Sequence, residues 1–448
     1  MKVRPRGDAR CSLLSHNEKV RCLLLILLLV TQAQAESLSE AVSRALANSP
    51  RMAEFRARTE EANYALEEAL APGRPQLDLN ASYTRQDPSV NLPLLNLTVQ
   101  PEHNYVVGLR ARQIVADFGR IHWAARSAQN RRTARELEAE EESLALAQET
   151  ALSYLESLLA QRSLQVAQDD LRSREEQMRV TKSRFESGAV ARFDTIRSQA
   201  ELASAKKRVL EAENRVRLAR AALESLAGGP LEPTEINALP SPPGSLEDGI
   251  GSALQRPLLE AMRAEHEAAQ SAVRVAESSD NPRLAFQTDY LRRNATGFYP
   301  DHQWSVSLQL EIPLFDGGLS AARTGQAGSR VTQLEARLQE AERTTRLQAE
   351  SAYLDLQSKW LQLEVAEDKR KQAEEARRLS VLRYKYGLAT HLELLDSETV
   401  FSQAKVEIYR ARYEYAGSWV AWGRVTNRLG EVLEYLSVPE GTRSEEEL

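Results

Sequence analysis

A spacing of 199 residues recurs through this 448-residue chain and relates two halves of similar design. The pairs that it relates are Asp117 with Asp316, Tyr154 with Tyr353, Gly188 with Gly387, and Asp194 with Glu393. A constant offset over a long stretch indicates an internal duplication, and a duplicated chain is expected to build each structural element twice. The fold therefore has to contain two related units.

Each half contains two stretches in which apolar and polar residues alternate. They cover about 76–86 and 104–115 in the first half, and about 283–293 and 303–314 in the second. A period of two predicts β-strands with one apolar and one polar face. The offset is 207 residues before the strands, from Pro50 to Pro257, so the first hairpin is longer by eight residues. We assign this extra length to residues 87–102, which contain three prolines and are expected to form a long loop.

Long helical patterns follow the strands in both halves. The strand-to-helix turns contain Asp117 and Gly119 in the first half, and Asp316, Gly317 and Gly318 in the second. The helical patterns cover about 120–187 and 189–227, and about 319–386 and 389–429. A helix of about 67 residues is about 100 Å long. Gly188 and Gly387 each interrupt the pattern once, which predicts a tight helix–turn–helix because glycine takes positive φ without steric cost.

These patterns divide the chain into a first repeat at 36–227, a Pro-rich linker at 228–244, a second repeat at 245–430 and an acidic tail at 431–448, which is expected to be irregular. Residues 1–35 are expected to be a secretory signal, with a basic start, an apolar stretch from Leu23 to Val30 and the cleavage motif Ala33-Gln34-Ala35. Both cysteines, Cys11 and Cys22, lie in this segment, so the mature chain is expected to have no disulfide and no thiol chemistry.

The charge of the mature chain argues against nucleic acid as a partner. Removal of the signal takes away six basic and two acidic residues, so the net charge changes from −6 to −10. A chain with this acidic excess repels a phosphate backbone. After the signal, the sequence contains no stretch of 18 apolar residues and so predicts no transmembrane helix.

The four strands have the length and alternation of strands that cross an outer membrane, where about ten tilted residues span the bilayer. Four strands cannot close a barrel, and open edges in lipid leave unpaired backbone groups that cost several kcal/mol each. The barrel is therefore expected to be shared between copies of the chain, and three copies would supply twelve strands. The long helices, paired as antiparallel coiled coils, would continue the barrel as a helical tube.

The signal, the two repeats and the segment from Arg383 to Asp396 together resemble TolC-like outer-membrane efflux proteins. That segment reads Arg-Tyr-Lys-Tyr-Gly-Leu-Ala-Thr-His-Leu-Glu-Leu-Leu-Asp. The resemblance covers nearly all of residues 36–430. It implies an α+β membrane protein, a homotrimer with a 12-stranded β-barrel in the outer-membrane lipid and an α-barrel in the periplasm. It also implies an exit duct for a tripartite efflux pump or a type I secretion system, with a periplasmic adaptor and an inner-membrane transporter as partners.

In that family the helix turns form the periplasmic entrance, which rests closed. The resemblance places Glu393 and Asp396 at two acidic ring positions, Asp194 at the acidic position of the first repeat, and Tyr384 at a tyrosine that holds the entrance shut. The family's arginine two residues after the turn glycine is replaced here by Ala389. Candidates to compensate for it are Arg192, Arg197 and Arg383.

The spacing of Glu393 and Asp396 supports such rings independently. Residues three apart share one face of a helix. Around a threefold axis, each would give three carboxylates at a narrow opening, which favours cations. The alternative is an ordinary solvated pair on a helix surface.

The sequence contains no motif for catalysis or for a cofactor. The histidines after the signal, His103, His122, His266, His302 and His391, have no paired metal-binding spacing. Neither a phosphate-binding loop nor a nucleophile motif is found. We therefore expect no enzyme activity, no cofactor and no metal. The remaining alternative to a channel is a periplasmic coiled-coil adaptor or scaffold, which would have no lipid-facing strands.

Overall fold

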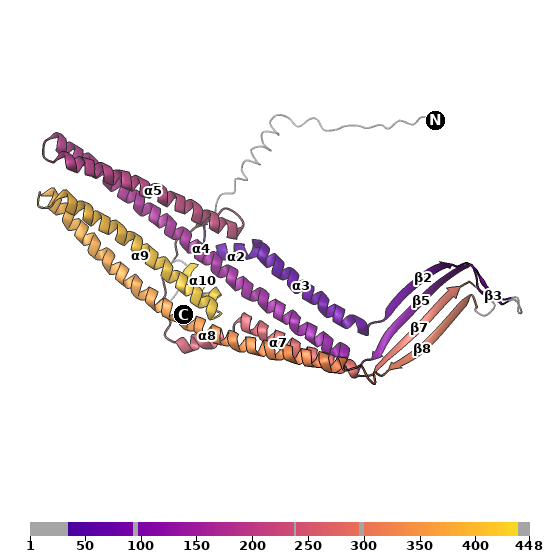
Figure 1. Cartoon of the computed structure of the whole chain (residues 1–448). Helices are drawn as coiled ribbons and strands as arrows, with labels where there is room; N and C mark the ends of the chain where they lie inside the picture. The colour runs from indigo at the N-terminus through magenta and orange to yellow at the C-terminus, as the bar shows by residue number, and fades with distance from the viewer. Residues whose placement is uncertain (1–34, 93–96, 237–238, 295–299, 438–448) are drawn as a thin grey trace, which may run out of the picture.

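The computed structural model describes residues 35–92, 97–236, 239–294 and 300–437. The predicted signal, apart from Ala35, and residues 438–448 of the predicted tail lie outside these ranges. The described chain is elongated, with a small antiparallel sheet at one end and the tips of two helical hairpins at the other (Figure 1). This is the predicted combination of long helices and duplicated strand hairpins.

The main sheet contains two strands from each half. They are β2 (Gln76–Arg85), β5 (His103–Ala116), β7 (Arg283–Arg293) and β8 (His302–Glu311). Their order is β2-β5-β7-β8 and every pair is antiparallel, so the two halves meet between β5 and β7. Within the described residues, β2 and β8 have no strand on their outer sides, and the chain does not close the sheet on itself.

One face of this sheet is apolar. The register places Leu79, Leu109, Tyr290 and Trp304 directly opposite one another across the four strands. Leu79 is 70% exposed and Trp304 is 72% exposed, because none of the described helices covers the sheet (Figure 1).

The opposite face of the sheet is polar. The row on that face contains Asp78, Arg110, Asp289 and Ser305. Arg110 Nε donates a hydrogen bond to Asp289 Oδ1 at 2.6 Å. The predicted alternation therefore gives a sheet with two chemically different faces.

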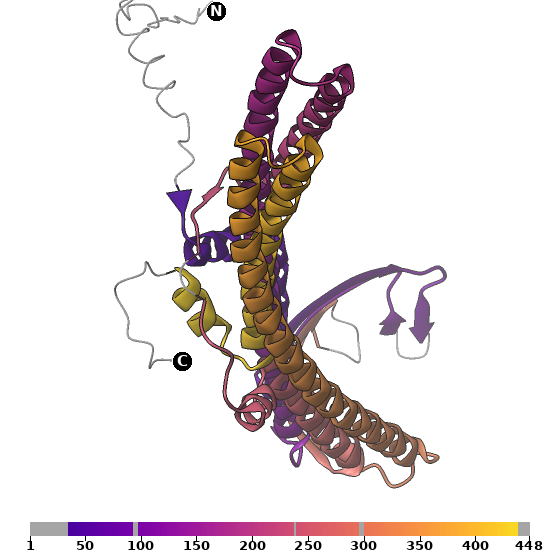
Figure 2. The same ribbon diagram turned by 90° about the vertical axis from the view of Figure 1, so that its left-hand side faces the viewer.

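Two helical hairpins extend away from the sheet. The first is α4 (Arg120–Glu186) with α5 (Arg192–Ala227), and the second is α8 (Leu319–Lys385) with α9 (His391–Val425). Helices α4 and α8 have 67 residues each, about 100 Å at 1.5 Å per residue. Both hairpin turns lie at the same end of the molecule (Figures 1 and 2), and α4 packs against α9 along the junction of the two halves.

Shorter helices precede the strands in each half. These are α2 (Leu38–Asn48) and α3 (Pro50–Leu70) in the first half, and α6 (Leu246–Ala253) and α7 (Pro257–Glu277) in the second. Pro50 and Pro257 are each the first residue of a helix, where a missing N–H costs nothing. Helix α3 packs on α4, and α7 packs on both α4 and α8, which continues the helical layer toward the sheet.

The main hydrophobic core lies midway along the molecule. We call it the equatorial core, and it includes Leu38, Tyr154, Leu158, Leu223, Trp419, Trp422 and Leu433. Trp419 Nε1 donates to the Tyr415 hydroxyl at 2.9 Å, and that hydroxyl donates to the carbonyl of Pro240 at 2.6 Å. Gly249 lies so close to the Trp422 ring that a Cβ there would be 2.1 Å from it. The core thus joins helices of both halves to the linker.

The prediction of an irregular tail was wrong for residues 431–437. The chain forms α10 (Leu429–Ser437), which buries Leu429, Val432, Leu433 and Leu436. These residues follow the i, i+3, i+4, i+7 spacing of a helix with one apolar stripe. The acidic residues of the segment occupy the other face.

Two segments predicted to be loops contain short strands. Within 87–102, β3 (Val90–Leu92) pairs with β4 (Leu97–Gln100) in an antiparallel hairpin. In the linker, β6 (Glu232–Pro233) pairs in parallel with β1 (Ala35–Glu36). The Tyr154 hydroxyl lies 2.8 Å from the carbonyl oxygen of Glu36 and 2.7 Å from that of Thr234, so it fastens both strands to α4.

Three helix boundaries differ from the prediction. Helices α5 and α9 begin at Arg192 and His391 rather than near 189 and 389, and α9 ends at Val425 rather than near 429. The starts are later because both glycine turns include several residues after the glycine.

Candidate functional site at the paired helix turns

The two glycine turns have the same backbone geometry. Gly188 has φ +75° and Gly387 has φ +74°. The N–H of the residue after each glycine bonds to a carbonyl five residues earlier: Ala189 to Arg184, and Leu388 to Arg383, both at 2.8 Å. This is a Schellman motif, which satisfies the last carbonyls of a helix and favours glycine at its left-handed position.

The starts of α5 and α9 differ in how they are capped. Thr390 Oγ1 accepts from the N–H of Glu393 at 3.2 Å, and the Glu393 carboxylate accepts in return from the N–H and hydroxyl of Thr390. This reciprocal pair is a capping box. In the first repeat Ala191 and Asp194 occupy these positions, and Ala191 has no side chain with which to cap α5. Glu393 therefore has a local structural contact that Asp194 lacks.

The other predicted entrance residues lie near the same tips but are not joined to one another. Asp396 is exposed one turn after Glu393, and no hydrogen bond or ion pair of its carboxylate is found within the described ranges. Arg383 lies 3.7 Å from Glu393 and donates to the carbonyl of Leu388 at 3.2 Å, so it serves its own turn. Arg192 is exposed, and Arg197 is partly buried with Nε unpaired among the residues described.

Tyr384 lies between the two halves. The guanidinium of Arg184, on α4, is 4.7 Å from the centre of the Tyr384 ring on α8. The centre of the His391 ring, on α9, lies 5.8 Å from the centre of the Tyr384 ring. Tyr384 therefore joins α8 to α4 through a cation–π contact.

His391 was not singled out as a site residue from the sequence, yet it is buried at the start of α9. It is 9% exposed, and its Nε2 lies 3.0 Å from Ser198 Oγ on α5. Burial lowers the pKa of His391; Asp194 opposes this effect, and Arg197, Arg174 and Arg184 add to it. A lone histidine carries no sequence signal for this contact, since Ser198 is 193 positions away.

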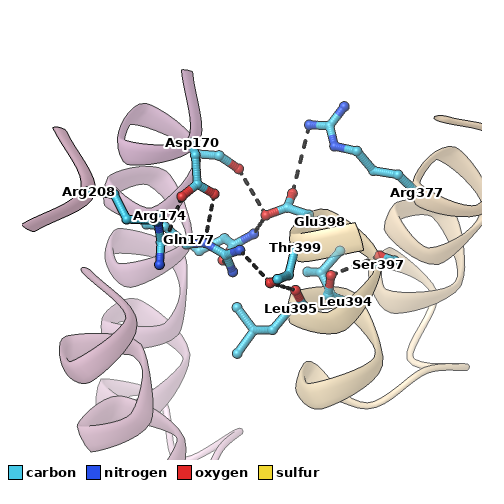
Figure 3. A network of polar contacts seen from close by, with 11 residues as sticks. Asp170, Arg174, Gln177, Arg208, Arg377, Leu394, Leu395, Ser397, Glu398 and Thr399 are labelled. Atoms are coloured by element: carbon cyan, nitrogen blue, oxygen red, sulfur yellow. Dashed lines mark hydrogen bonds and ion pairs between the residues drawn. The ribbon is translucent and has the colours of Figure 1, made fainter. Parts of the chain in front are cut away.

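A buried polar cluster joins α4 to α9 farther along the hairpins (Figure 3). Arg174 is 2% exposed and pairs with Asp170 at 3.2 Å, while Arg208 of α5 reaches the same carboxylate at 2.6 Å. Arg174 also donates to Thr399 Oγ1 on α9 at 3.1 Å. Buried charges are tolerated only when they are paired and hydrogen-bonded, and this cluster meets that condition across the junction of the halves.

Glu398 completes the cluster from the α9 side. Its side chain is 7% exposed and accepts hydrogen bonds from Gln177 and, at 3.0 Å, from Ser173. The nearest cation is Arg377 of α8, at 3.8 Å. The positions 199 residues away from Arg174 and Glu398 are Ala373 and Gln199, so the duplication does not repeat this cluster.

At the opposite end of α4 and α8, the strand-to-helix turns are also built alike. Asp117 accepts from the N–H groups of Gly119 and Ile121, and Asp316 from those of Gly318 and Ser320. The hydrogen bond from the Ser320 hydroxyl is the main reason that the pKa of Asp316 lies below its usual value. Gly119, Gly317 and Gly318 all have positive φ, which explains the glycines of both motifs.

Among the described residues, no group of three or more His, Cys, Asp and Glu side chains is arranged to hold a metal ion. None of the helices in the described ranges combines the length and the apolar character needed to cross a bilayer.

The sequence pattern of the outer membrane efflux protein family matches residues 41–229 and 250–427. These two segments correspond to the two repeats, and together they cover most of the chain. The chain therefore belongs to the outer membrane efflux protein family. It is an outer-membrane protein with a helical portion in the periplasm, and its family is one of transport proteins.

Curated relatives and solved structures agree with this assignment. The chain is 29% identical to the alkaline protease secretion protein AprF of Pseudomonas aeruginosa in an alignment of 282 positions, which covers 60% of this chain and 58% of AprF. It is 26% identical to nodulation protein T of Rhizobium leguminosarum bv. trifolii, over 79% of this chain and 77% of that protein. The CmeC outer membrane channel of Campylobacter jejuni shares the fold with a TM-score of 0.77 at 18% identity, over 90% of both chains. The predicted fold class is thus confirmed.

Proposed function

We propose that this chain is one of three subunits of an outer-membrane channel, which serves as the exit duct of a tripartite efflux pump or a type I secretion system. The observation that carries the proposal is the open four-stranded sheet, apolar on one face and polar on the other. Three such sheets, joined edge to edge, would form a 12-stranded barrel with the apolar face toward lipid and the polar face toward the lumen.

The unpaired edges supply the driving force for assembly. Strands β2 and β8 each expose a row of backbone N–H and C=O groups. In a bilayer each unsatisfied group costs several kcal/mol, so an isolated sheet is excluded there and only closure stabilises it. In a closed barrel, β2 of one subunit pairs with β8 of the next.

The helical hairpins would extend the barrel into the periplasm as a tube about 100 Å long. Transport through such a tube is passive, and the chain is not an enzyme. The substrate enters from an inner-membrane transporter, which a periplasmic adaptor joins to the helix tips. Relatives named for protein secretion and for pyoverdine export support this class of role, without fixing the substrate.

At the helix tips, the carboxylates of Asp396 and Glu393 form acidic rings around the entrance, with Asp194 and Tyr384 on neighbouring helices. Asp396 is exposed and free of local partners within the described residues, whereas Glu393 also caps α9. We expect Asp396→Asn to weaken the block of single-channel current by multivalent cations in planar bilayers. Glu393→Gln is the matched variant, because glutamine keeps the capping box and removes the charge. Unchanged block in both variants would place these side chains away from the ion path.

The direct test of the proposed function is fractionation followed by mass determination. The mature protein is expected to sediment with the outer membrane, to require detergent for extraction, and to have the mass of three chains in detergent. Recovery as a soluble monomer would refute the proposal.

The alternative, a periplasmic coiled-coil adaptor or scaffold, is less compatible with the sheet. A water-soluble scaffold would leave Leu79, Trp304 and their row exposed to solvent, since no helix within the described ranges covers them. Neutron reflectometry or protease protection of β2 and β8 in reconstituted bilayers separates the two functions, because only the channel places these strands inside the lipid.

A further inference from the structure

His391 is a buried titratable group at the end of the molecule assigned to the entrance. It is the first residue of α9, and its neighbours Leu392 and Glu393 are exposed while it is 9% exposed. Its Nε2 is bonded to Ser198, whose hydroxyl also lies 3.4 Å from Thr181 Oγ1 on α4. Its Nδ1 is buried and has no partner among the described residues. The side chain therefore joins the second hairpin to both helices of the first.

The charges that face His391 are mostly positive. Arg174 and Arg184 face it from α4, and Asp194 and Arg197 from α5. From α8 the neutral ring of Tyr384 packs against it. On its own helix, Glu393 is engaged by Thr390 and Arg383. Arg174 is itself paired with Asp170, so the excess of positive charge comes from Arg184 and Arg197 against Asp194, and the positive end of the α9 dipole adds to it.

This environment accommodates a neutral imidazole and not an imidazolium. A protonated ring has two N–H donors, and the site offers an acceptor for only one of them. A buried donor without a partner costs about 1–3 kcal/mol. The neighbouring guanidiniums add repulsion, so both the hydrogen bonding and the charge of the site favour the neutral form.

We propose that His391 makes the contact between the two helix tips sensitive to pH, so that acidification separates them and widens the entrance. The inference rests on the proposed function, because it treats these tips as the entrance of a channel. When the tips separate, the ring enters water and both nitrogens find partners.

The direction follows from proton linkage. In separated tips His391 is solvated and has an ordinary pKa of about 6.5, whereas in joined tips burial lowers its pKa. The stabilisation of joined tips is therefore fully present above about pH 6.5 and is lost progressively as the pH falls below it. The ratio of joined to separated tips changes by up to about tenfold per pH unit in each subunit.

The test compares wild type with His391→Gln between pH 7.5 and pH 5.5. Glutamine keeps a donor for Ser198 and does not titrate. The matched control is His266→Gln on α7, away from the tips, and His391→Asn is a second non-titrating variant. Two readouts are measured: single-channel conductance in planar bilayers, and the distance between spin labels on Ala189→Cys and Ala389→Cys in a background without Cys11 and Cys22.

In wild type and in His266→Gln, the label distance and the conductance are expected to rise as the pH falls, and in His391→Gln both should stay constant. The proposal is overturned if His391→Gln keeps the wild-type pH response, or if wild type shows no response. If wild type forms no channel but its label distance still responds through His391, the proposed function fails and the pH-sensitive contact stands.

Discussion

The equatorial core and the helix tips join the same two halves of the chain, but with different chemistry. At the equator, Tyr154 and Leu158 of α4 lie in one apolar cluster with Trp419 and Trp422 of α9, and all four are almost fully buried. Near the tips, α4 and α9 meet through Arg174, Glu398 and their hydrogen-bond partners. Separation of the apolar contact exposes apolar surface to water, whereas separation of the polar contact exchanges protein partners for water.

This difference suggests where the molecule can move. Burial of apolar area contributes about 25 cal/mol per Å² and has no substitute in water, so the equator acts as a permanent joint. Net contributions of single hydrogen bonds are only about 1 kcal/mol, because water competes for the same groups. The tips therefore form the weaker of the two joints, which is what the proposed entrance needs in order to open and close.

The largest effect is expected from Trp419→Ala. This change removes a side chain that is 4% exposed and leaves the Tyr415 hydroxyl without its donor. We expect a loss of about 3–5 kcal/mol in the free energy of unfolding, measured by guanidinium denaturation in detergent. Tyr64→Ala, on α3 and 67% exposed, is the control. Equal losses in the two variants would contradict an apolar joint at the equator.

An intermediate and local effect is expected from Arg174→Ala. It removes the donor to Thr399 and one of the two cations on buried Asp170, while Arg208 remains. We expect the free energy of local opening at the tips to fall by about 1–3 kcal/mol, with little change at the equator. Hydrogen exchange of residues 165–200 and 391–405 measures this difference. Arg172→Ala is the matched control, since Arg172 is 76% exposed and, among the described residues, pairs with neighbouring Asp169 alone. Faster exchange at the equator as well would show that the two joints are not independent.

The smallest effect concerns the helix starts within the tips. Thr390→Ala removes the capping box of α9 and should cost about 1 kcal/mol in its local stability. The reciprocal change, Ala191→Thr, supplies the missing cap at the start of α5 and should stabilise it by a similar amount. We expect hydrogen exchange at the start of α9 to become faster in Thr390→Ala, and exchange at the start of α5 to become slower in Ala191→Thr. If Ala191→Thr instead destabilises α5, the two turns are not structurally equivalent at the N-cap position.

The sequence predicted what is local or repeated, and it did not predict what is distant and unique. Gly188 and Gly387, and the four strands, were found because each has a periodic or duplicated signal. Helix α10 was missed because only four apolar residues mark it, within an acidic end.

The cross-repeat contacts were beyond sequence reasoning for a different reason. Arg174 and Glu398 look like ordinary charged residues of long charged helices, and the cluster has no counterpart 199 residues away. The bonds of Arg174 to Thr399 and of Glu398 to Gln177 depend on the packing of α4 against α9, which brings together residues more than 220 positions apart. Periodicity does not encode such a pairing.

The central claim is that the open edges of the sheet close against other copies of the chain. Cysteine pairs placed along β2 and β8, for example at Ser82 and Ser307, test it by oxidation in the native membrane and denaturing electrophoresis. We predict disulfides between chains and a ladder that ends at three chains. Disulfides formed only within single chains, or a ladder that continues beyond three, would contradict it.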